Sequence, residues 1–292
     1  MKIVIVGGVA GGASAAARAR RLSENAEIIV IERGPEPSFA NCGLPYYVGG
    51  VIADRRRLLV APKARLMSWY GLDVRTRHEV KSIDRTAQKI TVRNLDDGTS
   101  YEETYDKLIL APGAAPVRPP VPGANLPGVY TLRNLADADQ LHDAVTAGAR
   151  RAVVVGAGFI GIELVENLVD RGVETTLVEL VDQILPPWDR EMTVPVAEAL
   201  VKNGVRLVTS CSAEAIESTG TELTVSVSTG EKLTADLVVL SVGVRPESGL
   251  ARQAGLEIGP RGGIRVNEHM QTSDPDIYAV GDAIEVVEYV SG

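Results

Sequence analysis

The sequence of 292 residues has few cysteines, few aromatic side chains and few histidines. Its two cysteines, Cys42 and Cys211, lie far apart and indicate no disulfide framework, so we expect a cytoplasmic protein in a reducing compartment. Aromatic residues make up only 4%, and Val, Ile, Leu and Ala must therefore build most of the core. Because the three histidines have no metal-ligand spacing, we expect no metal site.

Long apolar runs and an excess of positive charge are also missing. The longest mostly apolar run, residues 152–165, contains glycines and is too short to span a bilayer, so we expect no membrane partner. A net charge of −8 argues against nucleic acid as the main partner. The first residues begin a strand pattern at once, without the basic segment and cleavage site of a secretion signal.

One pattern occurs twice: a strand, a glycine-rich turn, a helix, a second strand and an acid. The first copy has the turn Gly7–Gly12 and ends at Glu32, and the second has the turn Gly156–Gly161 and ends at Glu179. Such a turn lets the backbone approach a pyrophosphate, and the helix start offers free N–H groups to it. The acid accepts hydrogen bonds from a ribose diol. Two copies predict two bound dinucleotides.

The two halves continue in the same way beyond these turns. Alternating segments at 74–92 and 205–227 predict antiparallel meanders, and apolar runs that end at Gly113 and Gly243 predict buried parallel strands. A last short strand before Gly281-Asp282 is best explained as a return to the first sheet. We therefore predict an α/β fold of two Rossmann-type dinucleotide-binding domains with three-layer ββα architecture, the second inserted in the first. The predicted parts are 1–115 (first dinucleotide-binding domain, first part), 116–243 (second dinucleotide-binding domain) and 244–292 (first domain, return segment).

Together with the two turns, the strand end Leu110-Ala111-Pro112-Gly113 and the segment 278–283 resemble the flavoprotein disulfide reductase family over essentially the whole chain. The resemblance implies FAD on the first unit and a nicotinamide dinucleotide on the second. Val9 departs from the fingerprint, because it occupies the place of the second glycine. The implied FAD contacts are Gly7, Gly8, Val9, Ala10, Gly11, Gly12, Glu32, Arg33, Asn41, Val80, Ala111, Pro112, Gly113, Arg133, Gly281 and Asp282. The implied contacts of the nicotinamide dinucleotide are Gly156, Gly158, Phe159, Ile160, Gly161, Glu163, Glu179 and Gly243.

The segment Ser38–Tyr47 distinguishes branches of this family. Tyr47 stands five positions after Cys42 and Pro37 five positions before, so Cys42 has no local cysteine partner. The segment is similar to the single-cysteine branch, which includes coenzyme A-disulfide reductases, polysulfide reductases and peroxide-reducing NADH oxidases. A lone redox cysteine works through a mixed disulfide, a persulfide or a sulfenic acid. Free cysteine is usually a small buried hydrophobe, and we interpret Cys211 so, but the resemblance makes Cys42 the catalytic residue.

The helix after the first turn presents Ser14, Arg18 and Arg21 at spacings i, i+4 and i+7, hence on one face. Without context, such a face is typically only solvated. The resemblance implies instead that these residues contact coenzyme A phosphates together with Ser38 and Asn41. Arginine suits phosphate because its guanidinium donates hydrogen bonds in pairs.

Three residues of the second unit bear on the nicotinamide dinucleotide. Glu179 is followed by Leu180 rather than Arg, and its carboxylate would repel a 2′-phosphate, which favours NADH over NADPH. Phe159 matches an aromatic residue that covers the flavin in the family, although it could also fill the core. Glu163 matches a family glutamate near the nicotinamide.

The sequence thus predicts an FAD-dependent enzyme that uses NADH to reduce coenzyme A disulfide or a related low-molecular-weight disulfide or polysulfide through Cys42. Two alternatives stay open: an NADH oxidase or peroxidase that cycles Cys42 through sulfenic acid, and a flavin-bearing interaction protein that senses redox state. Relatives continue into a dimerisation domain and sometimes a rhodanese domain. We therefore expect the C-terminal dimerisation domain to be absent from these residues and the full-length protein to be a homodimer.

Overall fold

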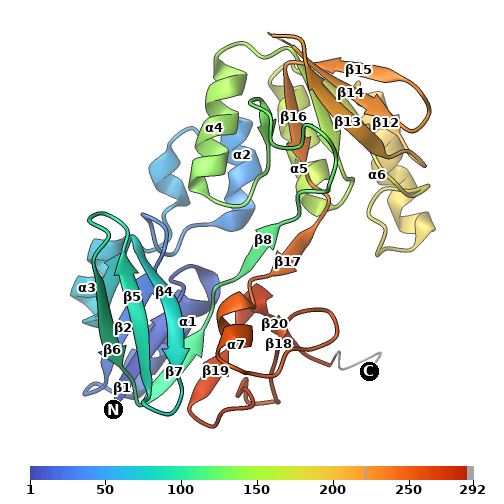
Figure 1. Cartoon of the computed structure of the whole chain (residues 1–292). Coiled ribbons are helices and arrows are strands. Elements are labelled where there is room, and N and C mark those ends of the chain that lie inside the picture. Colours follow the sequence, from blue (N-terminus) through green and yellow to red (C-terminus); the bar gives the residue numbers. More distant parts are fainter. Residues whose placement is uncertain (221, 288–292) are drawn as a thin grey trace. The chain divides into compact units, whose positions relative to one another are not determined.

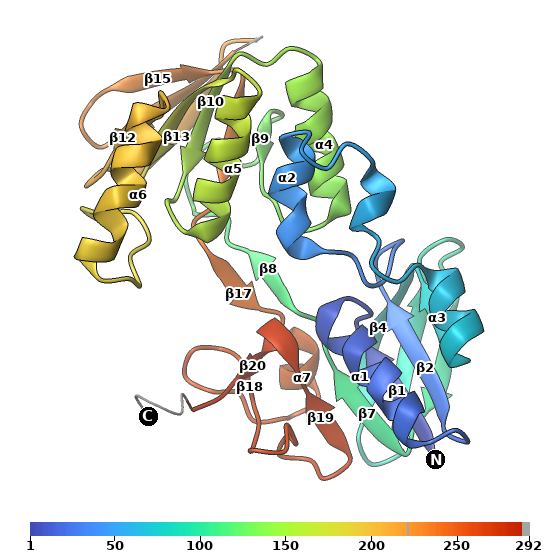
Figure 2. The same ribbon diagram turned by 180° about the vertical axis from the view of Figure 1, so that it is seen from behind.

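The computed structural model describes residues 1–220 and 222–287, which form two compact units (Figures 1 and 2). The first unit comprises Met1–Ala40, Leu59–Ala115 and Arg245–Gly292, and the second comprises Asn41–Leu58 and Pro116–Val244. The sequence-based division counts residues 41–58 with the first domain. In the structure they belong to the second unit, because their helix packs on two helices of that unit.

The first unit contains, in chain order, β1 (Lys2–Val6), α1 (Ala10–Leu22), β2 (Glu27–Glu32), α3 (Lys63–Tyr70), β3 (Asp73–Thr76), β4 (His78–Asp84), β5 (Lys89–Asn94), β6 (Ser100–Thr104), β7 (Lys107–Leu110), α7 (Gly249–Gln253), β18 (Ile264–Arg265), β19 (Ile277–Ala279), η3 (Gly281–Ala283) and β20 (Ile284–Glu285). Strands β8 (Ala114–Pro116) and β17 (Val244–Pro246), where the chain passes between the units, pair as a two-stranded sheet.

The second unit contains η1 (Asn41–Gly43), α2 (Leu44–Val48), η2 (Arg55–Leu58), β9 (Val129–Tyr130), α4 (Leu135–Thr146), β10 (Arg151–Val155), α5 (Phe159–Asp170), β11 (Glu174–Val178), α6 (Arg190–Lys202), β12 (Arg206–Val208), β13 (Ala213–Ser218), β14 (Leu223–Val227), β15 (Lys232–Ala235) and β16 (Leu237–Leu240).

A five-stranded parallel sheet in the order β19-β7-β1-β2-β3 forms the middle layer of the first unit. Its central strands β1 and β2 are buried on both faces, as expected of parallel strands covered on two sides. Ile3 and Ile5 pack toward residues of α1 and α3, whereas Val4 and Val6 pack against the antiparallel meander β4-β5-β6. In Figure 2, α1 and α3 lie in front of the sheet and the meander lies behind it.

The second unit repeats this plan with the sheet order β12-β11-β10-β16-β9. Val153 and Val155 pack with the meander β13-β14-β15 in one cluster, while α5 and α6 contact strands of the parallel sheet. In the first unit the outer strand beside β7 is β19, and Ile277 pairs with Leu108 across a long stretch of sequence. The predicted fold class, two three-layer Rossmann-type units with the second inserted in the first, is confirmed.

The short helix α2 is held tightly on the second unit, beside α4 in both views (Figures 1 and 2). Tyr47 stacks on His142 of α4 with ring centroids 4.6 Å apart, and the His142 Nδ1 atom lies 3.1 Å from the Tyr47 carbonyl oxygen. Gly49, just after α2, faces Asn167 of α5. A Cβ atom at Gly49 would lie 2.1 Å from Asn167 Oδ1, and Asn167 is only 2% exposed. The close approach of α2 to α5 therefore requires glycine at this position.

We expect Gly49→Ala to destabilise the second unit by about 1–3 kcal/mol, because a buried methyl group must displace the Asn167 amide. Thermal unfolding followed by circular dichroism should show a lower midpoint. The control is Gly249→Ala at the exposed start of α7, where a Cβ atom meets nothing within 4 Å. Equal midpoints for the two variants would contradict the packing argument.

Candidate functional site

The first glycine turn joins β1 to α1 and needs glycine for two separate reasons. Gly7 has φ +95°, and a Cβ atom on it would lie 2.1 Å from the Ala111 carbonyl oxygen. A Cβ atom on Gly12 would lie 1.8 Å from the Gly7 carbonyl oxygen. Val9, the residue that departs from the fingerprint, is the N-cap of α1, and no side-chain cap hydrogen bond forms there. The first N–H groups of α1 are therefore left without a side-chain acceptor at the N-cap.

Residues distant in sequence gather around this turn. The Ala111 N–H donates to the Val6 carbonyl oxygen at 2.7 Å, which brings the strand end 111–113 beside the turn. A Cβ atom on Gly11 would lie 3.7 Å from Gly281 Cα, so the segment that carries Asp282 also lies against it. Asp282 itself is exposed. The structure thus brings together three separate motifs that the sequence analysis assigned to FAD.

Glu32, at the end of β2, is buried and tied to the same turn. Its Oε2 atom accepts a hydrogen bond from the Gly8 N–H at 2.6 Å, and Oε1 accepts one from the Gly34 N–H at 2.6 Å. Bonds to a charged acceptor are short and strong, so the carboxylate and the turn hold each other in place.

Other residues predicted to contact FAD are placed differently. Arg33 forms an ion pair with Glu247 at 3.1 Å. Val80 is buried in the core between the parallel sheet and the meander, so its side chain serves packing. Asn41 and Arg133 belong to the second unit.

The second glycine turn reproduces the geometry of the first. A Cβ atom on Gly156 (φ +103°) would lie 2.4 Å from the Ser241 carbonyl oxygen, and one on Gly161 would lie 2.0 Å from the Gly156 carbonyl oxygen. Gly158 is the N-cap of α5, where no side-chain cap forms and no acid stands in the first turn, and Phe159 and Ile160 follow. Gly243 follows β16 with φ +101°.

Glu179 occupies the same place as Glu32, buried at the end of the second strand. Its Oε2 atom accepts from the Ala157 N–H at 2.6 Å, and Oε1 accepts from the Val181 N–H at 3.1 Å. The following loop, residues 180–189, contains no Lys or Arg. The nearby Arg190 is paired with Asp182 at 2.6 Å. Residues 180–190 therefore place no unpaired cation beside the Glu179 carboxylate.

Cys42 lies in η1 and is exposed, whereas Cys211 is buried; both are free. Tyr46 of α2 lies near Cys42 and Glu163. The pKa of the Tyr46 phenol is raised above its usual value, first by burial and then by the negative charges of Glu163, Glu166 and Cys42. The phenol consequently stays protonated and can donate a hydrogen bond near Cys42. The sequence analysis quoted Tyr46 within the motif without giving it a role.

The polar face of α1 is exposed as the helical spacing predicts. Ser14, Arg18 and Arg21 all face solvent, and neither guanidinium forms a hydrogen bond or ion pair within the described part of the chain. Arg20, by contrast, donates to main-chain carbonyls, including that of Tyr70 at 2.7 Å, and is structural.

Two further residues assigned to coenzyme A have distinct settings. Ser38 lies in the left-handed region with φ +48°, and its N–H donates to the Gly8 carbonyl oxygen at 2.8 Å, so it lies at the first turn. The Asn41 Oδ1 atom is buried and accepts no hydrogen bond from the described residues. A buried acceptor without a donor is unfavourable, which indicates a ligand or water there.

One residue that the sequence analysis did not assign, Trp188, lies at the second turn beside Phe159. The Phe159 and Trp188 rings meet edge to face, with centroids 6.2 Å apart and planes at 71°. Phe159 is 54% and Trp188 48% exposed. Two features of the sequence could have indicated a role for Trp188: aromatic residues are scarce in this chain, and Trp188 lies in the loop that follows Glu179.

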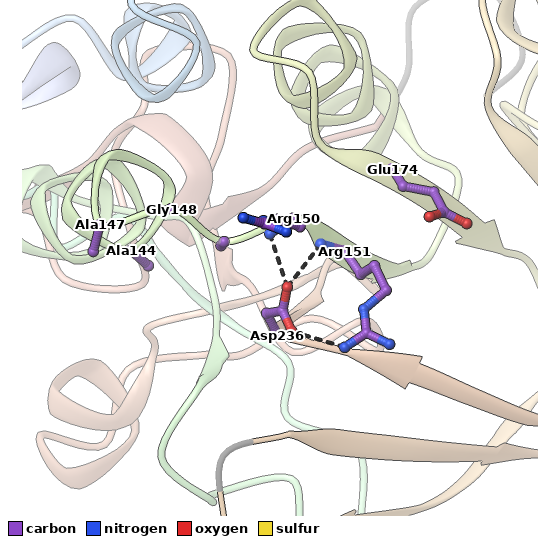
Figure 3. Close-up of a pocket in the computed structure, with 8 residues that line it drawn as sticks. Ala144, Ala147, Gly148, Arg150, Arg151, Glu174 and Asp236 are labelled. Atoms are coloured by element: carbon purple, nitrogen blue, oxygen red, sulfur yellow. Dashed lines mark hydrogen bonds and ion pairs between the residues drawn. The ribbon is translucent and has the colours of Figure 1, made fainter.

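A cavity of about 660 Å³ opens at the opposite end of the second unit's sheet (Figure 3), lined by Ala144, Ala147, Gly148, Ala149, Arg150, Arg151, Glu174 and Asp236. The Asp236 carboxylate accepts from the Arg150 N–H at 2.8 Å and the Arg151 N–H at 3.0 Å. Arg151 begins β10 and Glu174 begins β11. The cavity therefore lies at the amino ends of these strands, whereas the second turn follows the carboxyl end of β10. Nucleotides bind at the carboxyl ends of parallel strands, so this cavity is not the nucleotide site.

Two negative findings apply to residues 1–220 and 222–287. No three His, Cys, Asp or Glu side chains there are arranged to hold a metal ion. No helix in these ranges has the length and apolar character needed to cross a membrane.

The fold and both turns define a protein with two units that repeat the same dinucleotide-binding plan. Residues 1–291 match the family described as pyridine nucleotide-disulphide oxidoreductase, and the chain belongs to that family. This confirms the family inferred from the sequence motifs.

Three relatives illustrate the similarity. The coenzyme A disulfide reductase of Staphylococcus epidermidis is 38% identical over 284 residues, which cover 97% of this chain and 63% of the relative. The crystal structure of reduced Bacillus anthracis CoADR-RHD matches with a TM-score of 0.96 and 49% identity, covering 99% of this chain and 52% of that one. A NAD-dependent persulfide reductase from A. fulgidus matches with a TM-score of 0.96 and 40% identity, covering 100% and 55%. The chain thus spans less than two thirds of the length of these relatives.

Glu163 gives a pH-dependent prediction. Burial, and secondarily the charge of Glu166, raises the pKa of the Glu163 carboxyl above its ordinary value of 4.5. Between 4.5 and the raised pKa the folded state binds more protons than the unfolded state, so stability falls as pH rises through that window.

Glu163→Gln should therefore unfold at a higher temperature than the wild type at pH 7. The gain in the free energy of unfolding should stay within about 0.5 kcal/mol, since the Glu163 side chain is only partly buried. This difference should vanish below pH 4.5. The control Glu198→Gln, on the exposed face of α6, should change the midpoint equally at both pH values. A Glu163→Gln effect that is the same at pH 4 and pH 7 would contradict the assignment.

Proposed function

We propose that this chain is the two-dinucleotide part of an FAD-dependent reductase that uses NADH to reduce coenzyme A disulfide or a related low-molecular-weight disulfide or polysulfide. The observation that carries the proposal is the duplicated turn with its buried acid, joined to a single exposed cysteine in the second unit. Membership of the oxidoreductase family and similarity to coenzyme A disulfide and persulfide reductases support it.

FAD fits the first unit. Gly7 and Gly12 let the turn between β1 and α1 close tightly, because a Cβ atom on either would overlap main-chain atoms, and the uncapped start of α1 would then face the pyrophosphate. Glu32 would take the adenosine ribose and Asp282 the ribityl chain. When bound, FAD supplies two-electron redox chemistry between a pyridine nucleotide and a thiol. A homodimer of the longer protein and a cytoplasmic location stay predictions.

NADH fits the second unit for the same steric reason, at Gly156 and Gly161. Glu179 would accept hydrogen bonds from the ribose diol, since each of its oxygens has a lone pair beyond the one used by the backbone. The carboxylate and the absence of cations in residues 180–189 favour NADH over NADPH.

Cys42 would carry the chemistry on the disulfide. Its thiolate attacks one sulfur of the substrate R–S–S–R, which forms a Cys42–S–S–R mixed disulfide and releases RS⁻. Two electrons that originate in NADH then cleave the Cys42–sulfur bond, releasing the second RS⁻ and restoring the thiolate. The balance is one NADH, one proton and one disulfide consumed for one NAD⁺ and two thiols. The protonated Tyr46 phenol could stabilise the thiolate by donating a hydrogen bond.

Coenzyme A is the favoured thiol because the guanidiniums of Arg18 and Arg21 are exposed on one face of α1 and have no partner among the described residues. Ser14, Ser38 and Asn41 complete the proposed contacts. The unsatisfied Asn41 Oδ1 atom offers an acceptor to a ligand donor.

Cys42→Ser provides the direct test of the redox thiol. The wild-type chain, with its thiols reduced and its flavin oxidised, should gain one coenzyme A adduct on Cys42 from coenzyme A disulfide, as read from its peptide mass map, and NADH added under argon should then remove that adduct. Cys42→Ser should gain none, yet its flavin should still bleach with NADH, since hydride donation does not need the thiol. Cys211→Ser should behave as wild type because Cys211 is buried.

An adduct on Cys211 alone, or none on the wild type, would refute Cys42 as the disulfide-reducing thiol. Replacing the disulfide with hydrogen peroxide tests the alternative activity, because an oxygen adduct on Cys42 without any coenzyme A adduct would favour a peroxidase. Flavin that bleaches with NADH but transfers electrons to neither oxidant would favour the interaction protein.

The nucleotide preference gives a separate prediction. The wild-type flavin should be reduced faster by NADH than by NADPH at equal low concentrations. Glu179→Arg should raise the NADPH to NADH ratio of rate constants about tenfold, which corresponds to about 1.4 kcal/mol. Glu174→Arg makes the same charge change at the other end of β11 and should leave the ratio unchanged. Stopped-flow absorbance at the flavin band measures both, and a wild-type preference for NADPH would overturn the electrostatic argument.

A further inference from the structure

The Phe159–Trp188 pair lies next to the second glycine turn and has no role in the fold described so far. Phe159 is the first residue of α5, directly after the N-cap Gly158. A pyrophosphate at this helix start would therefore lie within one residue of the Phe159 side chain. Large apolar side chains that remain about half exposed at such a place offer contact area to a ligand.

The loop that carries Trp188 is fixed to the turn rather than loose on the surface. The Leu185 N–H donates to the Ala157 carbonyl oxygen at 2.8 Å, and Ile184 and Leu185 are buried. The Trp188 N–H donates to the Leu185 carbonyl oxygen at 2.9 Å, and Gln183 Nε2 donates to the Trp188 carbonyl oxygen at 2.9 Å. These bonds hold the Trp188 backbone and leave the indole ring to the Phe159 contact.

Edge-to-face geometry leaves ring surface uncovered. At 71° between planes, one ring presents its edge to the other, so the remaining faces stay open to a third flat ring. Both dinucleotide ends carry such a ring, adenine or nicotinamide. Stacking of a heteroaromatic base on an aromatic side chain is favourable for any base, since every base has a π-face.

We propose that Trp188 is a binding residue of the dinucleotide site, which stacks on a heteroaromatic ring of the dinucleotide while Phe159 holds the indole in place. This inference rests on the proposed binding of NADH to the second unit. The indole is well suited to an oxidised nicotinamide, because an electron-rich face attracts a cationic ring.

Trp188 and Trp69 are the two tryptophans of the chain, so a Trp69→Phe protein reports Trp188 alone. Trp69 is 73% exposed on α3 of the first unit, so its replacement should not disturb the second unit. The oxidised, flavin-loaded Trp69→Phe protein is excited at the red edge of indole absorption and titrated with NAD⁺. We expect saturable quenching with the same dissociation constant that calorimetry gives for NAD⁺. Titration with ADP-ribose and with nicotinamide mononucleotide then identifies the ring, because only the fragment that carries it should quench.

Trp188→Ala should weaken NAD⁺ binding about five- to 100-fold in calorimetry. Trp188→Phe should recover most of the affinity, and Phe159→Ala should lose part of it. Met192→Ala is the matched control, as it removes a 60% exposed apolar side chain at the start of α6 and should bind like wild type. Because the Trp188 side chain is half exposed, its truncation should leave the unfolding temperature nearly unchanged, which separates lost binding from lost folding.

The outcomes separate this inference from the proposed function. If calorimetry detects no NAD⁺ binding to wild type, the proposed nucleotide site is wrong. If NAD⁺ binds but Trp188 fluorescence does not change and Trp188→Ala binds within twofold of wild type, the stacking role of Trp188 is wrong.

Discussion

A buried carboxylate that accepts two backbone N–H groups fixes each nucleotide-binding end of this molecule. Glu32 and Glu179 bond to the glycine turn on one side and to the turn after their own strand on the other. The turn, the helix start and the acid therefore form one rigid element. Because the carboxylate is already oriented by the backbone, a ribose diol would meet a preformed acceptor and little ordering would be needed on binding.

That element depends in turn on the layers around it. Alternate residues of β1 pack toward helices and toward a meander, so the strand end carrying the glycine turn is anchored on both faces. The second unit repeats this with its own sheet. The two units therefore share the packing of the strand between helices and a meander as well as the sequence pattern. What differs is the fifth strand, which β19 provides in the first unit and β9 in the second.

The two units differ in the aromatic rings, the cysteine and the charged side chains near their glycine turns. Within residues 1–220 and 222–287, it is the second unit that carries exposed aromatic rings at its turn and the exposed cysteine on the segment 41–58. Its loop after Glu179, residues 180–189, contains no Lys or Arg and has carboxylates at Asp182 and Asp189, while the helix after the first turn has exposed guanidiniums. These surroundings support the proposals of NADH, which has no 2′-phosphate, for the second unit and of a phosphate-bearing thiol beside α1.

Local patterns in the sequence determined the strands that flank both glycine turns, the turns themselves and the two acids, because glycine at a positive φ and β-branched runs constrain the backbone whatever surrounds them. They also predicted that Cys42 has no disulfide partner, as the structure shows. The tertiary structure alone decided that residues 41–58 pack on the second unit, since that depends on the fit of Gly49 against Asn167. It alone placed Val80 in the core and joined Trp188 to Phe159. Contacts between residues far apart in the chain depend on packing, which no spacing within the sequence encodes.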